Sequence, residues 1–64
     1  MSNWYRFETG NDRRKEIVAR HLRCSGLRFE IEDASKRMRC DWWVFKIWLT
    51  DYQAKDLNTW LRAH

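Results

Sequence analysis

Residues 40–49, CDWWVFKIWL, constrain the fold of this chain more than any other segment. A strand with one solvated face alternates apolar with polar residues, but most positions in this segment are apolar. One uninterrupted apolar set contains Trp43, Phe45, Ile47 and Leu49. A strand with two apolar faces needs cover on both sides, which favours the centre of a sheet. In a short chain the second face must be covered by the chain itself or by another molecule.

The length of 64 residues predicts a single domain, residues 1–64, with a small core. A domain of this size buries only about 60 % of the surface that its unfolded chain exposes. The absence of proline and the 16 % of aromatic residues favour a folded domain without a linker. No segment approaches the roughly 20 apolar residues of a membrane span, and residues 1–10 lack the pattern of a signal peptide. We therefore expect a cytoplasmic protein without membrane contact, whose Cys24 and Cys40 are reduced.

Two further segments have the alternation of strands. In residues 3–9, Tyr5 and Phe7 share one face, and in residues 27–33 the odd-numbered positions are apolar up to Ile31. The opposite face of the first segment carries Trp4, Arg6 and Glu8. Period-two patterns of this length predict strands.

The sequence between these strands, DRRKEIVARHLRCSG, predicts a helix. Its apolar positions at helical spacing are Ile17, Val18, His21 and Leu22. Asn11 or Asp12 can cap its first turn, and Gly26 suits the left-handed residue just past a helix end.

A second helix is predicted after residue 50. The sequence TDYQ matches a capping box, in which Thr50 and Gln53 satisfy each other's free backbone N–H groups. The helix that follows would place Leu57, Trp60 and Leu61 on the core side.

A hairpin between residues 27–33 and 36–43 is predicted from charge pairing, with a tight turn at Ala34 and Ser35. The predicted cross-strand pairs are Glu32/Arg37, Glu30/Arg39 and Arg28/Asp41 on one face, and Ile31/Met38, Phe29/Cys40 and Leu27/Trp42 on the other. Each such pair contributes about 0.2–1 kcal/mol. To bring Trp43 to the same face as Met38 and Cys40, this register requires a β-bulge near Asp41 and Trp42.

The element order β-α-β-β-α predicts an α+β two-layer sandwich. A right-handed crossover from strand one to strand two leaves a gap that strand three fills, which gives a three-stranded antiparallel or mixed sheet of order 1-3-2. Both helices then cover one face. This architecture is similar to a ferredoxin-like fold that lacks its last strand.

The uncovered sheet face predicts a partner-binding surface. We expect it to carry Trp4, Arg6, Trp42, Val44, Lys46 and Trp48. Exposed apolar patches of a few hundred Å² usually mark interaction sites. The preferred hypothesis is a small non-enzymatic protein that docks on a larger protein as an accessory regulator or inhibitor. Phages and other mobile elements encode many such proteins, and host defence or nucleic-acid-processing complexes are frequent targets.

Three alternatives remain open. The net charge of +4 permits direct binding of DNA or RNA. The phosphate-binding residues would then be Arg13, Arg14, Arg20, Arg23, Lys36, Arg37 and Arg39. Two sheets could instead meet face to face in a homodimer with Trp42, Val44 and Trp48 at its centre. Finally, the indole rings could fold over the sheet edge or enter the core, and no docking surface would exist.

Neither a metal centre nor a catalytic site is predicted. His21, Cys24, Cys40 and His64 could supply four zinc ligands, but their spacing is not that of a known zinc module. Cys24 and His21 could form a thiol–imidazole pair only if both pointed outward, and no third residue at a recognisable spacing would orient them. We therefore expect no cofactor, no metal and no enzymatic activity.

Overall fold

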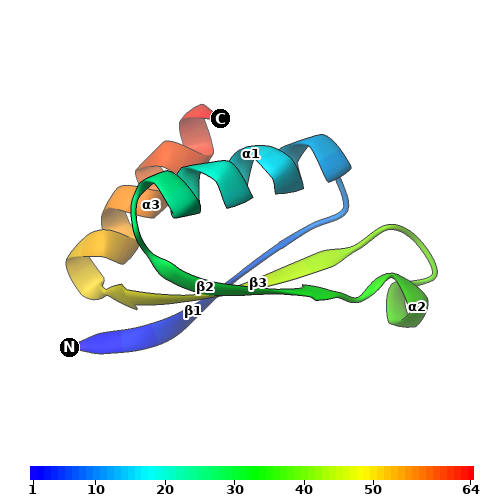
Figure 1. The fold of residues 1–64 in the computed structure, drawn as a ribbon, viewed down its shortest axis with the longest axis horizontal. Coiled ribbons are helices and arrows are strands. Elements are labelled where there is room, and N and C mark those ends of the chain that lie inside the picture. Colours follow the sequence, from blue (N-terminus) through cyan, green and yellow to red (C-terminus); the bar gives the residue numbers. More distant parts are fainter.

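The computed structural model describes all of residues 1–64 and contains three strands and three helices. In chain order they are β1 (Ser2–Thr9), α1 (Asp12–Cys24), β2 (Arg28–Asp33), α2 (Ser35–Met38), β3 (Trp43–Thr50) and α3 (Asp51–Ala63). The strands form one antiparallel sheet in the order β1-β3-β2. The helices α1 and α3 cover one face of this sheet (Figure 1). The predicted α+β fold with the apolar strand at its centre is therefore confirmed.

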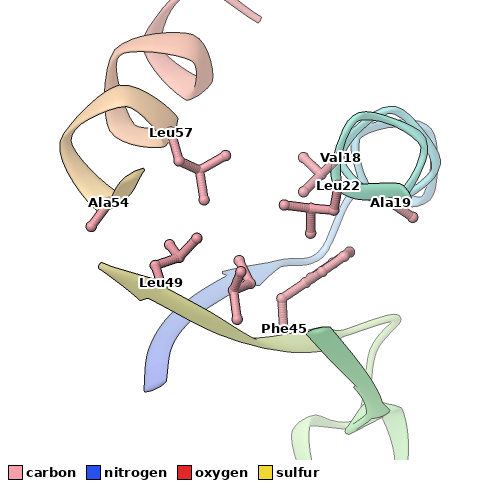
Figure 2. Close-up of a cluster of buried hydrophobic side chains, with 8 residues drawn as sticks. Val18, Ala19, Leu22, Phe45, Leu49, Ala54 and Leu57 are labelled. Atoms are coloured by element: carbon pink, nitrogen blue, oxygen red, sulfur yellow. The ribbon is translucent and has the colours of Figure 1, made fainter. Parts of the chain in front are cut away.

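The core lies between β3 and the two long helices. Phe45, Ile47 and Leu49 of β3 are almost completely buried. Figure 2 shows the side chains of the helix layer that pack in the same cluster. They are Val18, Ala19 and Leu22 of α1 and Ala54 and Leu57 of α3. Fully burying one large aliphatic or aromatic side chain stabilises a fold by about 1.5–3 kcal/mol, so this single strand anchors both helices.

The helix boundaries follow the predicted local signals. The Asn11 side chain accepts a hydrogen bond of 3.0 Å from the backbone N–H of Arg14 at the start of α1. Gly26 follows the helix end with a φ of 68°, in the left-handed region that glycine tolerates. At the start of α3, the backbone N–H of Thr50 donates to Gln53 Oε1 at 2.9 Å, and that of Gln53 donates to Thr50 Oγ1 at 3.2 Å.

The predicted hairpin register is wrong. None of its six pairs exists, because β3 begins at Trp43 and Phe29 pairs with Ile47 instead of Cys40. The pairing is shifted by seven residues along the third strand. A shift by an odd number of residues moves every side chain of a strand to the opposite face. Trp43 and every second residue after it therefore face the helices, and the β-bulge that the predicted register required is not needed. Burial of Phe45 and Ile47 is worth more than the charge pairs of the other register.

A connection at residues 34–42 replaces the predicted tight turn. It contains the short helix α2 and ends that helix at Arg39, whose φ of 58° is left-handed. The backbone N–H of Ala34 donates to the carbonyl of Trp42 at 2.9 Å, which closes the connection. Hydrogen bonds from the side chain and main chain of Ser35 hold the pKa of Asp33 below its usual range. In Figure 1, α2 lies beyond the end of β2, away from the layer of α1 and α3.

The helix residues at apolar spacing are buried to different degrees. Val18 and Leu22 belong to the core, whereas Ile17 is 40 % exposed on the outer side of α1. His21 is half-buried and stacks on Trp60 with ring centroids 3.9 Å apart. Trp60 and Leu61 pack at the margin of the core, on the predicted side of α3. None of the three helices has the length and apolarity needed to cross a bilayer.

Candidate functional site

The open face is the side of the sheet opposite α1 and α3. The strand register arranges its side chains in rows that run across all three strands. The rows are Trp4, Trp48 and Arg28, then Arg6, Lys46 and Glu30, and then Glu8, Val44 and Glu32. The three rows differ in character, and only the first presents large apolar surface to solvent.

The first row, Trp4, Trp48 and Arg28, is called the tryptophan row below. Trp4 on β1 lies directly opposite Trp48 on β3, and their rings pack edge to face with centroids 5.1 Å apart at 65°. The Arg28 side chain extends from the far strand, and its Cζ lies 5.7 Å from the centroid of the Trp4 ring. Trp4 is 46 % exposed and Trp48 is 39 % exposed. Each ring is therefore held by its neighbours while much of its surface remains in water.

The charges of the open face, taken over all three rows, are balanced in number. Its cations are Arg6, Arg28 and Lys46, and its carboxylates are Glu8, Glu30 and Glu32. Arg6 and Glu8 form an ion pair with Nε and Oε2 3.2 Å apart. Lys46 lies opposite Arg6 on one side and Glu30 on the other. This face consequently has little net charge with which to attract a polyanion.

Trp42 was predicted as an exposed contact residue in the third strand, but it is half-buried and lies in the connection before β3. The indole Nε1 donates to Glu8 Oε1 at 2.9 Å, and the backbone N–H donates to Ser35 Oγ at 3.1 Å. The ring is half-buried and lies against Gly10, where an added Cβ would come within 2.9 Å of it. The hydrogen bond from the Trp42 indole, together with the positive charge of Arg6, holds the pKa of Glu8 below its usual range. Trp42 therefore attaches the connection at residues 34–42 to the side of β1.

Val44 is a second correction, because it lies on the open face as predicted but has an exposed fraction of 0 %. Glu8 and Glu32 flank it in register, and the connection at residues 34–42 lies at this end of the sheet. The covered Val44 cannot contact a partner. The second apolar face of β3 is thus covered by the chain at one end and open at the tryptophan row.

The seven cations of the predicted nucleic-acid site do not form one surface. Arg13, Arg14, Arg20 and Arg23 belong to α1 in the helix layer, whereas Lys36, Arg37 and Arg39 lie in or next to α2. Arg14 also has structural contacts, because its Nη2 donates to the carbonyl of Leu61 at 3.0 Å and its guanidinium lies over the Phe7 ring. A single phosphate backbone would have to cross two layers of the molecule to meet all of these residues.

The histidines lie at a different place in the fold from the cysteines. His21 and His64 stack on Trp60, with centroid distances of 3.9 and 4.3 Å. Cys24 is exposed and lines a groove along α1 with Ile17, whereas His21 is half-buried against Trp60. Cys40 is exposed in the connection, and both cysteines are free thiols. The four residues considered as zinc ligands are not brought together, since no group of three or more metal-ligating side chains exists in the structure.

Arg28 is the member of the tryptophan row that the sequence did not predict, since the wrong register assigned it to Asp41. The observed register places Arg28 directly opposite Trp48, which itself lies opposite Trp4. Only this register could have identified Arg28 as a member of the row. Comparison with family models, with curated proteins and with solved structures found no match to this chain.

Proposed function

We propose that this protein is a non-enzymatic binding protein that docks on a larger protein through the tryptophan row. The observation that carries the proposal is the pair of edge-to-face indole rings, Trp4 and Trp48, both more than a third exposed beside the Arg28 guanidinium. Tryptophan and arginine are the residues most enriched among the contacts that dominate protein interfaces.

Rigidity of the row supports this role. Binding loses affinity when mobile side chains must be ordered at the interface, at about 0.5–1.5 kcal/mol for each flexible side chain. Trp4 and Trp48 already restrain each other, and Arg28 extends over the Trp4 ring. Burial of their exposed surface by a partner would therefore gain apolar contact with little additional ordering.

The charges of the open face favour a protein partner over a nucleic acid. Three cations and three carboxylates lie on it together, a mixture that another mixed protein surface can complement. Arg6 and Lys46, next to the tryptophan row, would set the orientation and the rate of association. A domain with one such surface acts by occupying a site on its partner, as accessory regulators and inhibitors do.

The test compares two variants that both lose aromatic surface. The double variant Trp4→Ala/Trp48→Ala removes the exposed rings, and Tyr52→Ala removes an aromatic ring that is 82 % exposed on α3. Both are immobilised and exposed to a lysate of the source organism, with circular dichroism as the check on folding. We expect the Tyr52→Ala protein to capture the same partner as the wild type and the double variant to lose it.

Capture that persists in the folded double variant would refute the proposal. Binding of DNA or RNA that weakens steeply with salt would identify nucleic-acid binding instead. Light scattering that shows a dimer, lost in Trp4→Ala/Trp48→Ala, would replace the larger partner with a second copy.

A further inference from the structure

The outer edge of β1 has no strand partner. β1 lies at the margin of the sheet and pairs only with β3, along all eight of its residues. In such a strand alternate residues direct their backbone N–H and C=O groups away from the sheet. The backbone hydrogen bonds outside helices and strands involve no residue of β1. This edge is therefore an open template for one more strand.

A small apolar hollow lies between this edge and α3. Its volume is about 70 Å³, and its lining includes Tyr5 and Phe7 of β1 together with Leu49, Leu57 and Leu61. Tyr5, Phe7 and Leu61 are half-buried, so the apolar layer under α3 is incomplete on this side. A strand added to β1 would direct alternate side chains toward the helix layer, and one of them could enter the hollow.

Cations without carboxylate partners stand beside the hollow. Arg14 and Arg62 line the neighbouring surface together with Leu61. The ion pairs of the structure are Arg6–Glu8, Lys15–Asp12 and Lys15–Glu16, and none involves Arg14 or Arg62.

We propose that β1 binds an extended, acidic segment of another protein as a fourth strand. Its backbone would pair with the open edge, an apolar side chain would fill the hollow, and carboxylates would meet Arg14 and Arg62. Strand addition of this kind derives affinity from main-chain hydrogen bonds and specificity from side-chain pockets. A second copy of this chain fits less well, because it would bring the same two cations to the same edge.

This surface is separate from the tryptophan row. The hollow lies on the helix side of the sheet, whereas the rings of Trp4 and Trp48 lie on the open face. Strand addition therefore does not depend on the proposed function, and each can be tested with the other surface removed.

The probe is a synthetic peptide of about ten residues in which every second side chain would face the helix layer. Of these positions the central one is valine, for the hollow, and those on either side are glutamate, for Arg14 and Arg62; the positions between them are threonine. Binding is followed by two-dimensional NMR of the isotope-labelled protein and by amide hydrogen exchange. We expect shifts over residues 2–9 and slower exchange at the alternate amides of this segment that point to the open edge. N-methylation of every second residue, in two peptides that differ in which set is methylated, should abolish binding only where the methylated N–H groups would face β1. A peptide with lysine in place of glutamate should bind far more weakly.

Charge reversal locates the contact. Arg62→Glu should weaken binding about fivefold, at the upper limit for an exposed ion pair. Arg14→Glu serves as a second variant, with its folding checked because Arg14 also contacts Leu61. Arg20→Glu is the matched control, since Arg20 is an exposed arginine that lines the groove on the outer side of α1. Its affinity for the peptide should equal that of the wild type.

Three results would overturn the inference. Amides of residues 2–9 that stay unperturbed at millimolar peptide would exclude strand addition, and equal binding of the lysine peptide would exclude the acidic partner. Exchange protection of β1 that rises with protein concentration alone would assign the edge to a second copy. Unchanged peptide binding by Trp4→Ala/Trp48→Ala would support strand addition even if capture of the larger partner failed.

Discussion

Replacement of Gly10 by alanine tests whether Trp42 is a structural anchor. A Cβ at position 10 would lie 2.9 Å from Cε3 and 3.0 Å from Cζ3 of the Trp42 ring, and 3.1 Å from the carbonyl oxygen of Asp41. The ring cannot simply withdraw, because its Nε1 is hydrogen-bonded to Glu8. Gly26 is the one glycine with a positive φ, so alanine at position 10 introduces crowding and not left-handed strain.

The expected loss of stability follows from two opposing effects. Overpacking of this kind costs about 1–3 kcal/mol. Alanine also restricts the unfolded chain more than glycine does, which stabilises the protein by about 0.4–1 kcal/mol. The free energy of unfolding should therefore fall by about 1–2 kcal/mol. With a urea dependence of about 1 kcal/mol per M for a domain of this size, the midpoint should fall by about 1–2 M.

The assay is urea unfolding followed by far-ultraviolet circular dichroism, in wild-type and Trp42→Ala backgrounds. Without the indole ring only the contact with the Asp41 carbonyl oxygen remains, so the loss of stability on Gly10→Ala should be much smaller than in the wild-type background. Gly26→Ala is the control, because an added Cβ there meets no atom within 4 Å and its φ is 68°. Its cost of about 1–2 kcal/mol comes from the backbone alone and should be equal in both backgrounds.

An equal loss for Gly10→Ala in both backgrounds would refute this reasoning. The Trp42 ring would then not pack against Gly10. The assignment of Trp42 as a structural residue outside the docking surface would lose its support.

Three further predictions concern the pH response, a helix cap and the core. Trp42→Phe removes the indole N–H, so the pKa of Glu8 should rise toward its ordinary value in an NMR titration. In the wild type, the stability that the lowered pKa of Glu8 provides is present at pH values above the unfolded-state pKa. It is lost as the pH falls through the folded-state pKa. Thr50→Ala should lower the free energy of unfolding by about 1 kcal/mol in denaturant titrations, whereas Thr59→Ala, on the exposed side of α3, should change it by less than about 0.5 kcal/mol. Phe45→Ala should cost about 3–5 kcal/mol, which is comparable to the whole stability of a small domain, and circular dichroism should show a largely unfolded chain; a cooperative native-like transition would contradict the central place of β3.

Local signals in the sequence were sufficient for the two long helices, α1 and α3, but not for α2, where a tight turn was predicted. Asn11, Gly26 and the pair Thr50 and Gln53 act through backbone groups within a few residues, so neighbours in sequence determine their role. The order of the strands followed from the right-handed crossover, which leaves a gap between the first two strands, and from the apolarity of the strand that contains Phe45, which suits the central place.

The register of β2 against β3 could not be predicted from charge pairs. Ala34 and Ser35 are not the residues of a two-residue hairpin turn, so nothing local fixed the alignment. The rejected register offered six pairs of modest value, but the observed one buries Phe45 and Ile47 under the helices. Trp42 and Trp48 are alike in sequence, and only the register separates the structural ring from the exposed one.

The pairing of β1 with β3 has a consequence for the synthesis of the protein. Ser2 pairs with Thr50, so most of the sequence lies between the two partners. β1 and β2 are not neighbours in the sheet, and each meets only β3. While the ribosome is still translating the first forty residues, the two finished strands therefore have nothing to pair with. The domain completes its sheet only when its last third has emerged, and until then its nascent aromatic residues depend on the surroundings of the ribosome for protection from aggregation.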